Sequence, residues 1–253
     1  MARRIVDLSH LIESSPQDVP EFLRVSVEYT DHAAGAAGAE KQFGVPRRLM
    51  RNGEGPAGET LTISTHAGTH LDAPWHYNSI IQGKPPQSID ELPLDWFLAP
   101  GVVVDMRHKQ DGDAVSSHEM SDAISKAGHQ LSAGDIVLVQ TGRDAFYHDP
   151  EYMLKGCGVT PEATRWLFEQ GVRVMGIDAW SWDAPMDGQA EEALARDEEG
   201  IFWGAHQVDL PYSQIERLTN LAALPPTGFI VACFPLKIKG ASAGLARVVG
   251  IID

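Results

Sequence analysis

The sequence predicts an α/β fold, and three stretches of the chain carry that prediction. Residues 135–140 form an apolar run with Ile-Val-Leu-Val at its centre, which is typical of a buried strand. A helix is expected from 160 to 169 or 170, because Thr160 can cap the first turn and Pro161 suits the first helical position. Residues 172–177 form another apolar strand, and a strand–helix–strand succession favours parallel pairing with a right-handed crossover. The end of the chain is β-rich, with strands expected at 228–234, 236–239 and 245–252.

Composition limits the number of domains and the kinds of partner. The 253 residues are 43% hydrophobic, which suffices for one large domain over 1–253, and no shift in composition divides the chain. The formal net charge of −15 opposes binding to nucleic acid, whose phosphates require a basic surface. No apolar stretch is long enough to span a bilayer or to act as a secretory signal. We therefore expect a cytoplasmic protein with a small-molecule substrate and without nucleic-acid or membrane partners.

Cysteine usage agrees with a reducing compartment. The chain contains only Cys157 and Cys233, which excludes a disulfide-rich framework. Cys233 lies in an apolar run, so we expect it in the core.

The most distinctive feature is the stretch 66–76, which holds three histidines and one aspartate. Glycine and proline within this stretch disfavour a helix. In an extended chain His66, His70, Asp72 and His76 have the same parity, so their side chains project to one side. The spacing therefore indicates a shared site, whereas scattered loop histidines are the ordinary alternative.

A shared metal ion requires the chain to bend within this stretch. A straight strand would separate the α-carbons of His66 and His70 by roughly 13 Å, too far for both imidazoles to lie about 2 Å from one ion. Gly68 permits the chain to fold back, because glycine adopts positive φ readily. Two neutral imidazoles and a carboxylate suit zinc, manganese or iron, and three protein ligands leave positions open for water and substrate. This pattern predicts a catalytic metal site with a proton-handling histidine beside it.

The stretch 66–76 resembles the signature of the cyclase family that includes bacterial kynurenine formamidases and isatin hydrolases. The resemblance implies a swivelling β/β/α domain with a mixed central sheet and a metal-dependent hydrolase of amides. It implies His66, His70 and Asp72 as metal ligands and His76 as the acid–base residue. Further stretches that resemble the family lie at 6–10, 141–143, 176–178, 216–221 and 234–238.

The same resemblance leaves open whether the site holds one ion or two. In the formamidases Asp72 would bridge two zinc ions, and His206 and Glu216 match the later histidine and glutamate that hold the second. In isatin hydrolases a single manganese is expected, so the implied cofactor is Mn²⁺ or Zn²⁺. His206 is equally compatible with a pocket or loop histidine, and Glu216 with an exposed partner of Arg217. The family also implies a homodimer or homotetramer.

The expected reaction is hydrolysis of a small cyclic or aryl amide, such as an isatin-like lactam or an N-formylkynurenine-like formamide. A divalent ion activates water and polarises a carbonyl, and His76 would accept a proton from water and return it to the leaving nitrogen. The alternative for His76 is a fourth metal ligand. Trp75 and Phe43 are the candidate substrate-binding residues; Trp180 and Trp182 belong either to the same aromatic wall or to the core.

Other functions are compatible with parts of the sequence. Lactone hydrolysis would use the same machinery, and a non-haem Fe(II) oxygenase would also use two histidines and a carboxylate, although usually in an all-β barrel. A metal-binding module without turnover is a third alternative. Residues 240–244 fit a nucleophile-elbow pattern, but no histidine follows Ser242, so a tight turn is expected there. The acidic segment 187–199 is expected to be a solvated face or a lid that precedes His206.

Overall fold

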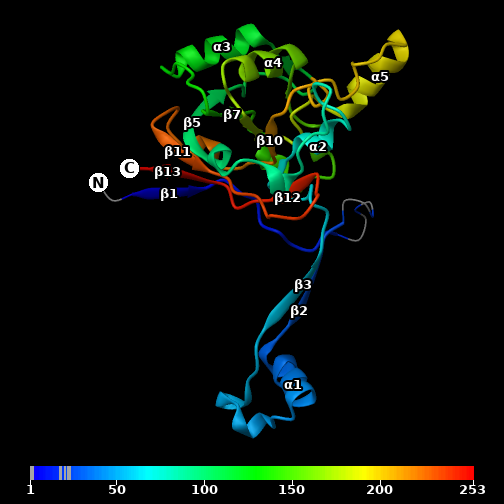
Figure 1. Cartoon of the computed structure of the whole chain (residues 1–253), viewed down its shortest axis with the longest axis vertical. Coiled ribbons are helices and arrows are strands. Elements are labelled where there is room, and N and C mark those ends of the chain that lie inside the picture. Colours follow the sequence, from blue (N-terminus) through cyan, green and yellow to red (C-terminus); the bar gives the residue numbers. More distant parts are fainter. Residues whose placement is uncertain (1–2, 17–18, 20, 22–23) are drawn as a thin grey trace. The chain divides into compact units, whose positions relative to one another are not determined.

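The computed structural model describes residues 3–16, 19, 21 and 24–253 (Figure 1). Contacts between residues divide the chain into two compact units: the first unit holds the residues up to 11 and 68–253, and the second unit holds 12–67. A compact unit need not fold independently, so the single domain over 1–253 stays a prediction. Within the described ranges, no helix combines the length and apolar character that crossing a bilayer requires.

The first unit is built on a nine-stranded mixed sheet, with the strand order β1-β13-β11-β5-β7-β9-β10-β4-β12. Strands β5, β7, β9 and β10 are parallel to their neighbours in this series, and the remaining pairings are antiparallel. The α/β class with a mixed central sheet is confirmed. The strands are β1 (Arg4–Asp7), β4 (His70–Asp72), β5 (Leu98–Asp105), β7 (Ile136–Gln140), β9 (Val174–Ile177), β10 (Ser213–Glu216), β11 (Phe229–Ala232), β12 (Ala243–Leu245) and β13 (Val249–Ile252).

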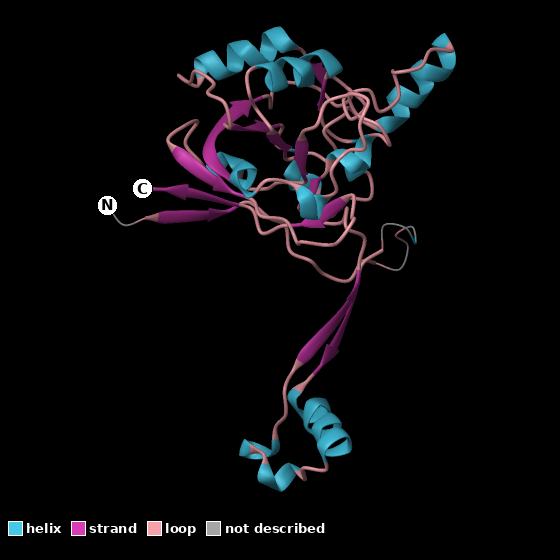
Figure 2. Cartoon of the chain, in the orientation of Figure 1, coloured by secondary structure: helices cyan, strands magenta, loops and turns pink. Residues whose placement is uncertain are grey.

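Four α-helices, several short 3-10 helices and one short strand pair complete the described part of the first unit. Figure 2 colours helices cyan and strands magenta. The pair is parallel and consists of β6 (Ala114–Val115) and β8 (Gly158–Val159). Helices α3 and α4 lie close together on one side of the sheet (Figure 1). The helices are α2 (Pro74–Tyr77), α3 (Ser117–Lys126), α4 (Pro161–Glu169) and α5 (Met186–Arg196).

The described part of the second unit contains a β-hairpin, one α-helix and two short 3-10 helices. Strands β2 (Ser26–Thr30) and β3 (Gly58–Thr62) pair antiparallel. Helix α1 (His32–Phe43) begins where the Asp31 side chain accepts a hydrogen bond from the backbone N–H of Ala34. It ends at Gly44, whose φ of 67° is the left-handed conformation that glycine adopts without strain.

The predicted strand–helix–strand unit is confirmed. The Thr160 hydroxyl caps α4 by accepting the N–H of Ala163, and Pro161 occupies the first turn. Strands β7 and β9 on either side of the helix are parallel neighbours. The second strand begins at Val174, two residues later than predicted. Gly171 has a φ of 93° where the helix ends, and the Val172 N–H still donates to the Leu167 carbonyl oxygen, so the chain joins the sheet only after this turn.

Two predictions for the C-terminal strands are wrong. Residues 236–239 form no strand, because the chain there leads into a turn at Gly240, which has a φ of 68°. The expected strand 245–252 is interrupted, since β12 pairs with β4 whereas β13 pairs with β1 and β11. These partners lie toward opposite ends of the sheet, so the chain must leave one and cross to the other. The turn expected around Ser242 is present, directly before β12.

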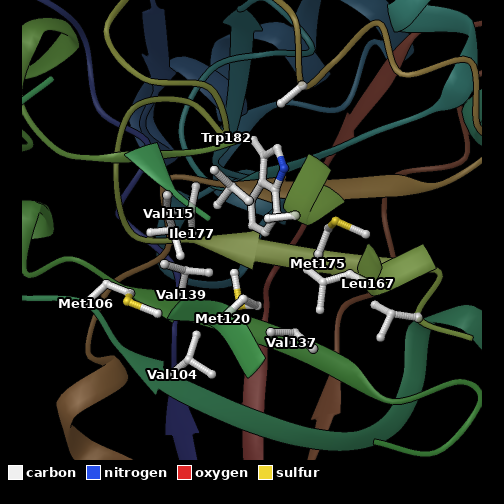
Figure 3. Close-up of a cluster of buried hydrophobic side chains, with 14 of the residues drawn as sticks. Val104, Met106, Val115, Met120, Val137, Val139, Leu167, Met175, Ile177 and Trp182 are labelled. Carbon is white, nitrogen blue, oxygen red and sulfur yellow. The ribbon is translucent and has the colours of Figure 1, made fainter. Parts of the chain in front are cut away.

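Apolar side chains cover both faces of the parallel strands. One face packs against α3 and α4 through Met120 and Leu167, and Trp182 is fully buried in the same cluster (Figure 3). Val137 and Val139 face this cluster, whereas Ile136 and Leu138 face a second cluster on the other side. A strand buried on both faces has no polar alternation, which explains the continuous apolar run in the sequence. Cys233 is fully buried, as predicted.

Two of the family-like stretches meet at the ends of β7 and β9. The buried carboxylate of Asp178 accepts hydrogen bonds from the Thr141 N–H at 2.6 Å, the Thr141 hydroxyl at 2.6 Å and the Gly142 N–H at 2.9 Å. These bonds tie the loops after the two strands together. Burial raises the pKa of the Asp178 carboxyl to about 6, against the effect of those bonds.

Replacing Asp178 by asparagine should destabilise the fold. The amide would place an N–H donor against the donor groups of Thr141 or Gly142, and a buried unsatisfied group costs about 1–3 kcal/mol. Urea unfolding at pH 8, where Asp178 is ionised, measures the loss. The control is Asp105→Asn, whose exposed ion pair with Arg107 should contribute less than about 1 kcal/mol. Equal stabilities of Asp178→Asn and the wild type would contradict the structural role of Asp178.

Candidate metal site

The pairing of β4 with β10 brings the first chemically important side chains together. In the antiparallel register His70 lies opposite Glu216, and Leu71 lies opposite Ile215. Leu71 and Ile215 are fully buried in the second apolar cluster, so the alternating residues turn to the other face of the sheet. His70, Asp72 and Glu216 therefore share one face, which confirms the parity predicted for His70 and Asp72.

The bend predicted before His70 is also present. Gly68 has a φ of 58°, the left-handed conformation that glycine tolerates. Its carbonyl oxygen lies 2.9 Å from Nδ1 of the fully buried His70. Because a carbonyl only accepts hydrogen bonds, Nδ1 carries the proton and the Nε2 lone pair is directed elsewhere. This is the tautomer that a metal-binding imidazole requires.

Four side chains converge beyond that nitrogen. His70 Nε2 lies 3.4 Å from Asp72 Oδ1 and 3.6 Å from Glu216 Oε2. His206 Nε2 lies 3.8 Å from Asp72 Oδ2 and 3.5 Å from Glu216 Oε1. Ligand atoms about 2 Å from a tetrahedral ion are roughly 3.3 Å apart. The spacing of these nitrogen and oxygen atoms is thus the spacing expected around a shared cation.

Neighbouring groups hold two of the four side chains in place. The Asp183 carboxylate accepts a hydrogen bond from His206 Nδ1 at 2.5 Å and another from the His206 backbone N–H at 3.0 Å. Glu216 Oε1 accepts hydrogen bonds from the Ser181 hydroxyl and the Trp182 N–H, both at 3.0 Å. Such supporting bonds fix the orientation of metal ligands.

Sequence reasoning did not find Asp183 and Ser181. The available signal was their position shortly after β9, since ligand sites gather beyond the carboxyl ends of parallel strands. Trp182, between them, donates its indole N–H to Thr164 and belongs to the core, so it is not part of an aromatic pocket wall.

Electrostatics also favour a cation at this place. Three buried carboxylates, from Asp72, Asp183 and Glu216, surround the imidazoles of His70 and His206. Burial alone would lower the pKa of His206, but its bonds to the three carboxylates raise that pKa well above the ordinary value. Burial raises the pKa of Glu216, and the contact with His206 outweighs this and lowers it. Buried negative charge must be offset, and a divalent ion would do so without protonating His206. The donor set therefore fits a divalent metal.

His76 lies beside this cluster. It stands on the short helix α2, which begins at Pro74 directly after β4. A ring nitrogen of the half-buried His76 lies within 4.8 Å of an Asp72 carboxylate oxygen, and its ring centre is 5.8 Å from that of His206. Its ring also meets the Trp203 ring edge-on, with centres 5.0 Å apart. His76 is thus placed to exchange protons with molecules bound at the cluster.

The remaining sequence candidates are His66, Phe43 and Trp75. His66 belongs to the second unit, where its backbone N–H donates to the Ser64 hydroxyl at 3.2 Å. Phe43 also belongs to the second unit and is 69% exposed, and Trp75 on α2 is 46% exposed. The metal-binding role of His66 and the substrate-binding roles of Phe43 and Trp75 stay predictions.

The comparison with known proteins identifies the family. A family model described as "Putative cyclase" matches residues 6–184. The chain belongs to this family. The match includes the 66–76 stretch and ends before His206 and Glu216, so those two residues are connected to the site by the structure and not by the family model.

Relatives and solved structures agree with the cyclase-family assignment. A kynurenine formamidase of Salinibacter ruber is 31% identical over 193 residues, covering 75% of this chain and 77% of that protein. An isatin hydrolase of Roseibium aggregatum is 26% identical over 206 residues, covering 76% and 73%. In fold, the chain is similar to isatin hydrolase A from Ralstonia solanacearum, with a TM-score of 0.76, 23% identity and coverage of 99% and 92%.

Proposed function

We propose that this cyclase-family protein is a metal-dependent hydrolase of small cyclic or aryl amides. The observation that carries the proposal is the buried convergence of His70, Asp72, His206 and Glu216, whose donor atoms lie 3.4–3.8 Å apart. The substrate class is supported by the kynurenine formamidase and the isatin hydrolase to which the chain is similar. Opening of an isatin-like lactam and cleavage of an N-formylkynurenine-like formamide are the two leading reactions.

We propose that His70, Asp72, His206 and Glu216 hold Mn²⁺ or Zn²⁺, as one ion or as two. His66 is proposed as a further ligand from its place in the chain, four residues before His70. Imidazole and carboxylate donors together suit these two ions better than Ca²⁺ or Mg²⁺. When bound, such an ion supplies Lewis-acid activation of water and of the substrate carbonyl.

The chain itself supplies proton transfer and positioning. His76 accepts a proton from the attacking water and then gives it to the nitrogen that leaves, so that an amine and not an amide anion departs. Its half-buried position next to Asp72 leaves the imidazole accessible to a bound molecule. Asp183 and Ser181 keep His206 and Glu216 oriented throughout.

The fold argues against the functions that competed with this proposal. The mixed sheet with helices packed against it is unlike the all-β barrels in which two-histidine-one-carboxylate iron sites usually occur. Ser242 lies at the entry to β12, and its carbonyl oxygen accepts a hydrogen bond from the Ala73 N–H. The nucleophile-elbow pattern requires a histidine downstream of the serine, and none follows Ser242 in the sequence. Lactone hydrolysis remains a neighbouring reaction for the same residues.

We further propose a cytoplasmic homodimer or homotetramer. The two cysteines are free and buried, in agreement with a reducing compartment. The second unit exposes large apolar side chains, including Tyr29, Leu49 and Leu61, and a two-stranded hairpin is at best marginally stable alone. A second copy of the chain is the partner that would cover them.

Two histidine variants separate metal binding from catalysis. His70→Ala should lose both the metal and turnover, because it removes a donor from the buried cluster. His76→Ala should retain the metal and lose turnover by about 10²–10⁴-fold, the usual contribution of general acid–base catalysis. Metal content by emission spectroscopy and turnover of isatin and N-formylkynurenine, assayed side by side, provide the measurements.

The exposed His118 offers a matched control, since His118→Ala should change neither quantity. A metal-free His76→Ala protein would make His76 a metal ligand. Undiminished turnover by that variant would remove its proton-transfer role, and a metal-loaded wild type without turnover of either substrate would overturn the proposed function.

Light scattering tests the assembly. The wild type should have two or four times the 27.5 kDa mass of the chain, and Leu49→Glu should shift it toward the monomer by placing a charge in the covered surface. Leu194→Glu, on the exposed helix α5, should leave the mass unchanged. A monomeric wild-type protein at micromolar concentration would refute the assembly.

A further inference from the structure

Trp203 contacts both His76 and His206 at the candidate site. Its ring stacks on His206, with centres 4.7 Å apart and planes inclined by 25°. The same ring meets His76 edge-on, at 5.0 Å and 84°. The indole therefore borders the place where a molecule between His76 and the metal ligands would bind.

The backbone of Trp203 is held in an uncommon conformation. Its φ of 60° lies in the left-handed region, which large residues seldom adopt. Residues held in such rare conformations are often found at functional sites. Gln189, on helix α5, accepts the Trp203 backbone N–H at 2.7 Å and donates its own side-chain N–H to the Ala184 carbonyl. The turn is tight, since a Cβ at Gly204 would lie 2.6 Å from the Gly200 carbonyl oxygen. These contacts hold the backbone from which the indole projects.

The indole nitrogen of Trp203 is buried and has no hydrogen-bond partner among the described residues. Buried tryptophan N–H groups usually find an acceptor, as that of Trp182 does with Thr164. A donor without one, next to residues that would hold metal and transfer protons, is suited to an acceptor that arrives with the substrate.

We propose that the Trp203 indole N–H donates a hydrogen bond to the oxygen of the scissile carbonyl and to the same oxygen in the carboxylate product. This inference rests on the proposed amide hydrolysis. As water adds to the carbonyl carbon, negative charge grows on that oxygen, so a fixed N–H donor strengthens its bond during the reaction. Trp203 is then a catalytic residue that contacts the substrate, and Gln189 is its positioning residue.

A purely structural role makes a different prediction. If Trp203 only supports His206 by stacking, phenylalanine should replace it with little effect, because a phenyl ring retains the stacking. If the N–H is required, Trp203→Phe should retain metal and lower kcat by about 10²–10³-fold, the cost of removing one such donor, with a much smaller change in KM. Trp96→Phe, a partly buried residue packed on the other face of the sheet, is the matched control and should keep wild-type kinetics.

Nuclear magnetic resonance reads the hydrogen bond without turnover. The chain has six tryptophans, and the indole N–H signal that disappears in zinc-loaded Trp203→Phe belongs to Trp203. Titration of the zinc-loaded wild type with formate and with isatinate should move this proton signal downfield while the Trp96 signal stays in place. An unmoved Trp203 signal at millimolar concentrations of both ligands, or wild-type kcat in Trp203→Phe, would overturn the inference. A downfield shift in a wild type that hydrolyses neither substrate would leave the N–H contact standing while the proposed function fails.

Discussion

The register between β4 and β10 is the constraint on which the site depends. It places His70 opposite Glu216 and, through the pleat, turns Asp72 to the same face. The register is fixed by Leu71 and Ile215, which are fully buried on the other face. A slip of one residue would exchange the faces, burying the imidazole among apolar side chains and directing leucine to the metal. The same pair of strands thus carries core residues on one face and the residues of the candidate site on the other.

The polar face of these strands carries buried negative charge that a bound divalent cation would offset. Hydrophobic packing alone would not hold three carboxylates near two imidazoles, because each buried charge loses its hydration. Glu216 Oε1 accepts hydrogen bonds from the Ser181 hydroxyl and the Trp182 backbone N–H. Asp183 accepts a hydrogen bond from Nδ1 of His206, the ring nitrogen that faces away from the cluster. These supports come from the loop beyond the carboxyl end of β9, where α/β sheets commonly place their binding groups. Burying these charged groups lowers the folding stability of the metal-free protein, and the same groups form the site that would accept a divalent ion.

Local signals in the sequence were sufficient for the parts of the fold that local chemistry decides. The apolar run of β7 and the Thr160-Pro161 start of α4 need no distant contact to be recognised, and the bend at Gly68 follows from ligand geometry. The C-terminal strands were misjudged because their bounds depend on which strand each segment pairs with. β12 joins β4 while β13 joins β1 and β11, and no nearby residue encodes that choice.

The same distinction applies to the site. His70 and Asp72 were recognisable from parity within one short stretch, whereas His206 and Glu216 reach them only through strand pairing and a long loop. Asp183 and Trp203 have no regular spacing from the 66–76 stretch, because they reach the site only in the folded chain, where both contact His206. The most direct test of the account is anomalous diffraction from crystals of the zinc- or manganese-loaded protein. The account predicts a peak about 2.0–2.3 Å from His70 Nε2 and from carboxylate oxygens of Asp72, with His206 and Glu216 around the same centre. A bound ion elsewhere, with these four side chains left uncoordinated, would contradict it.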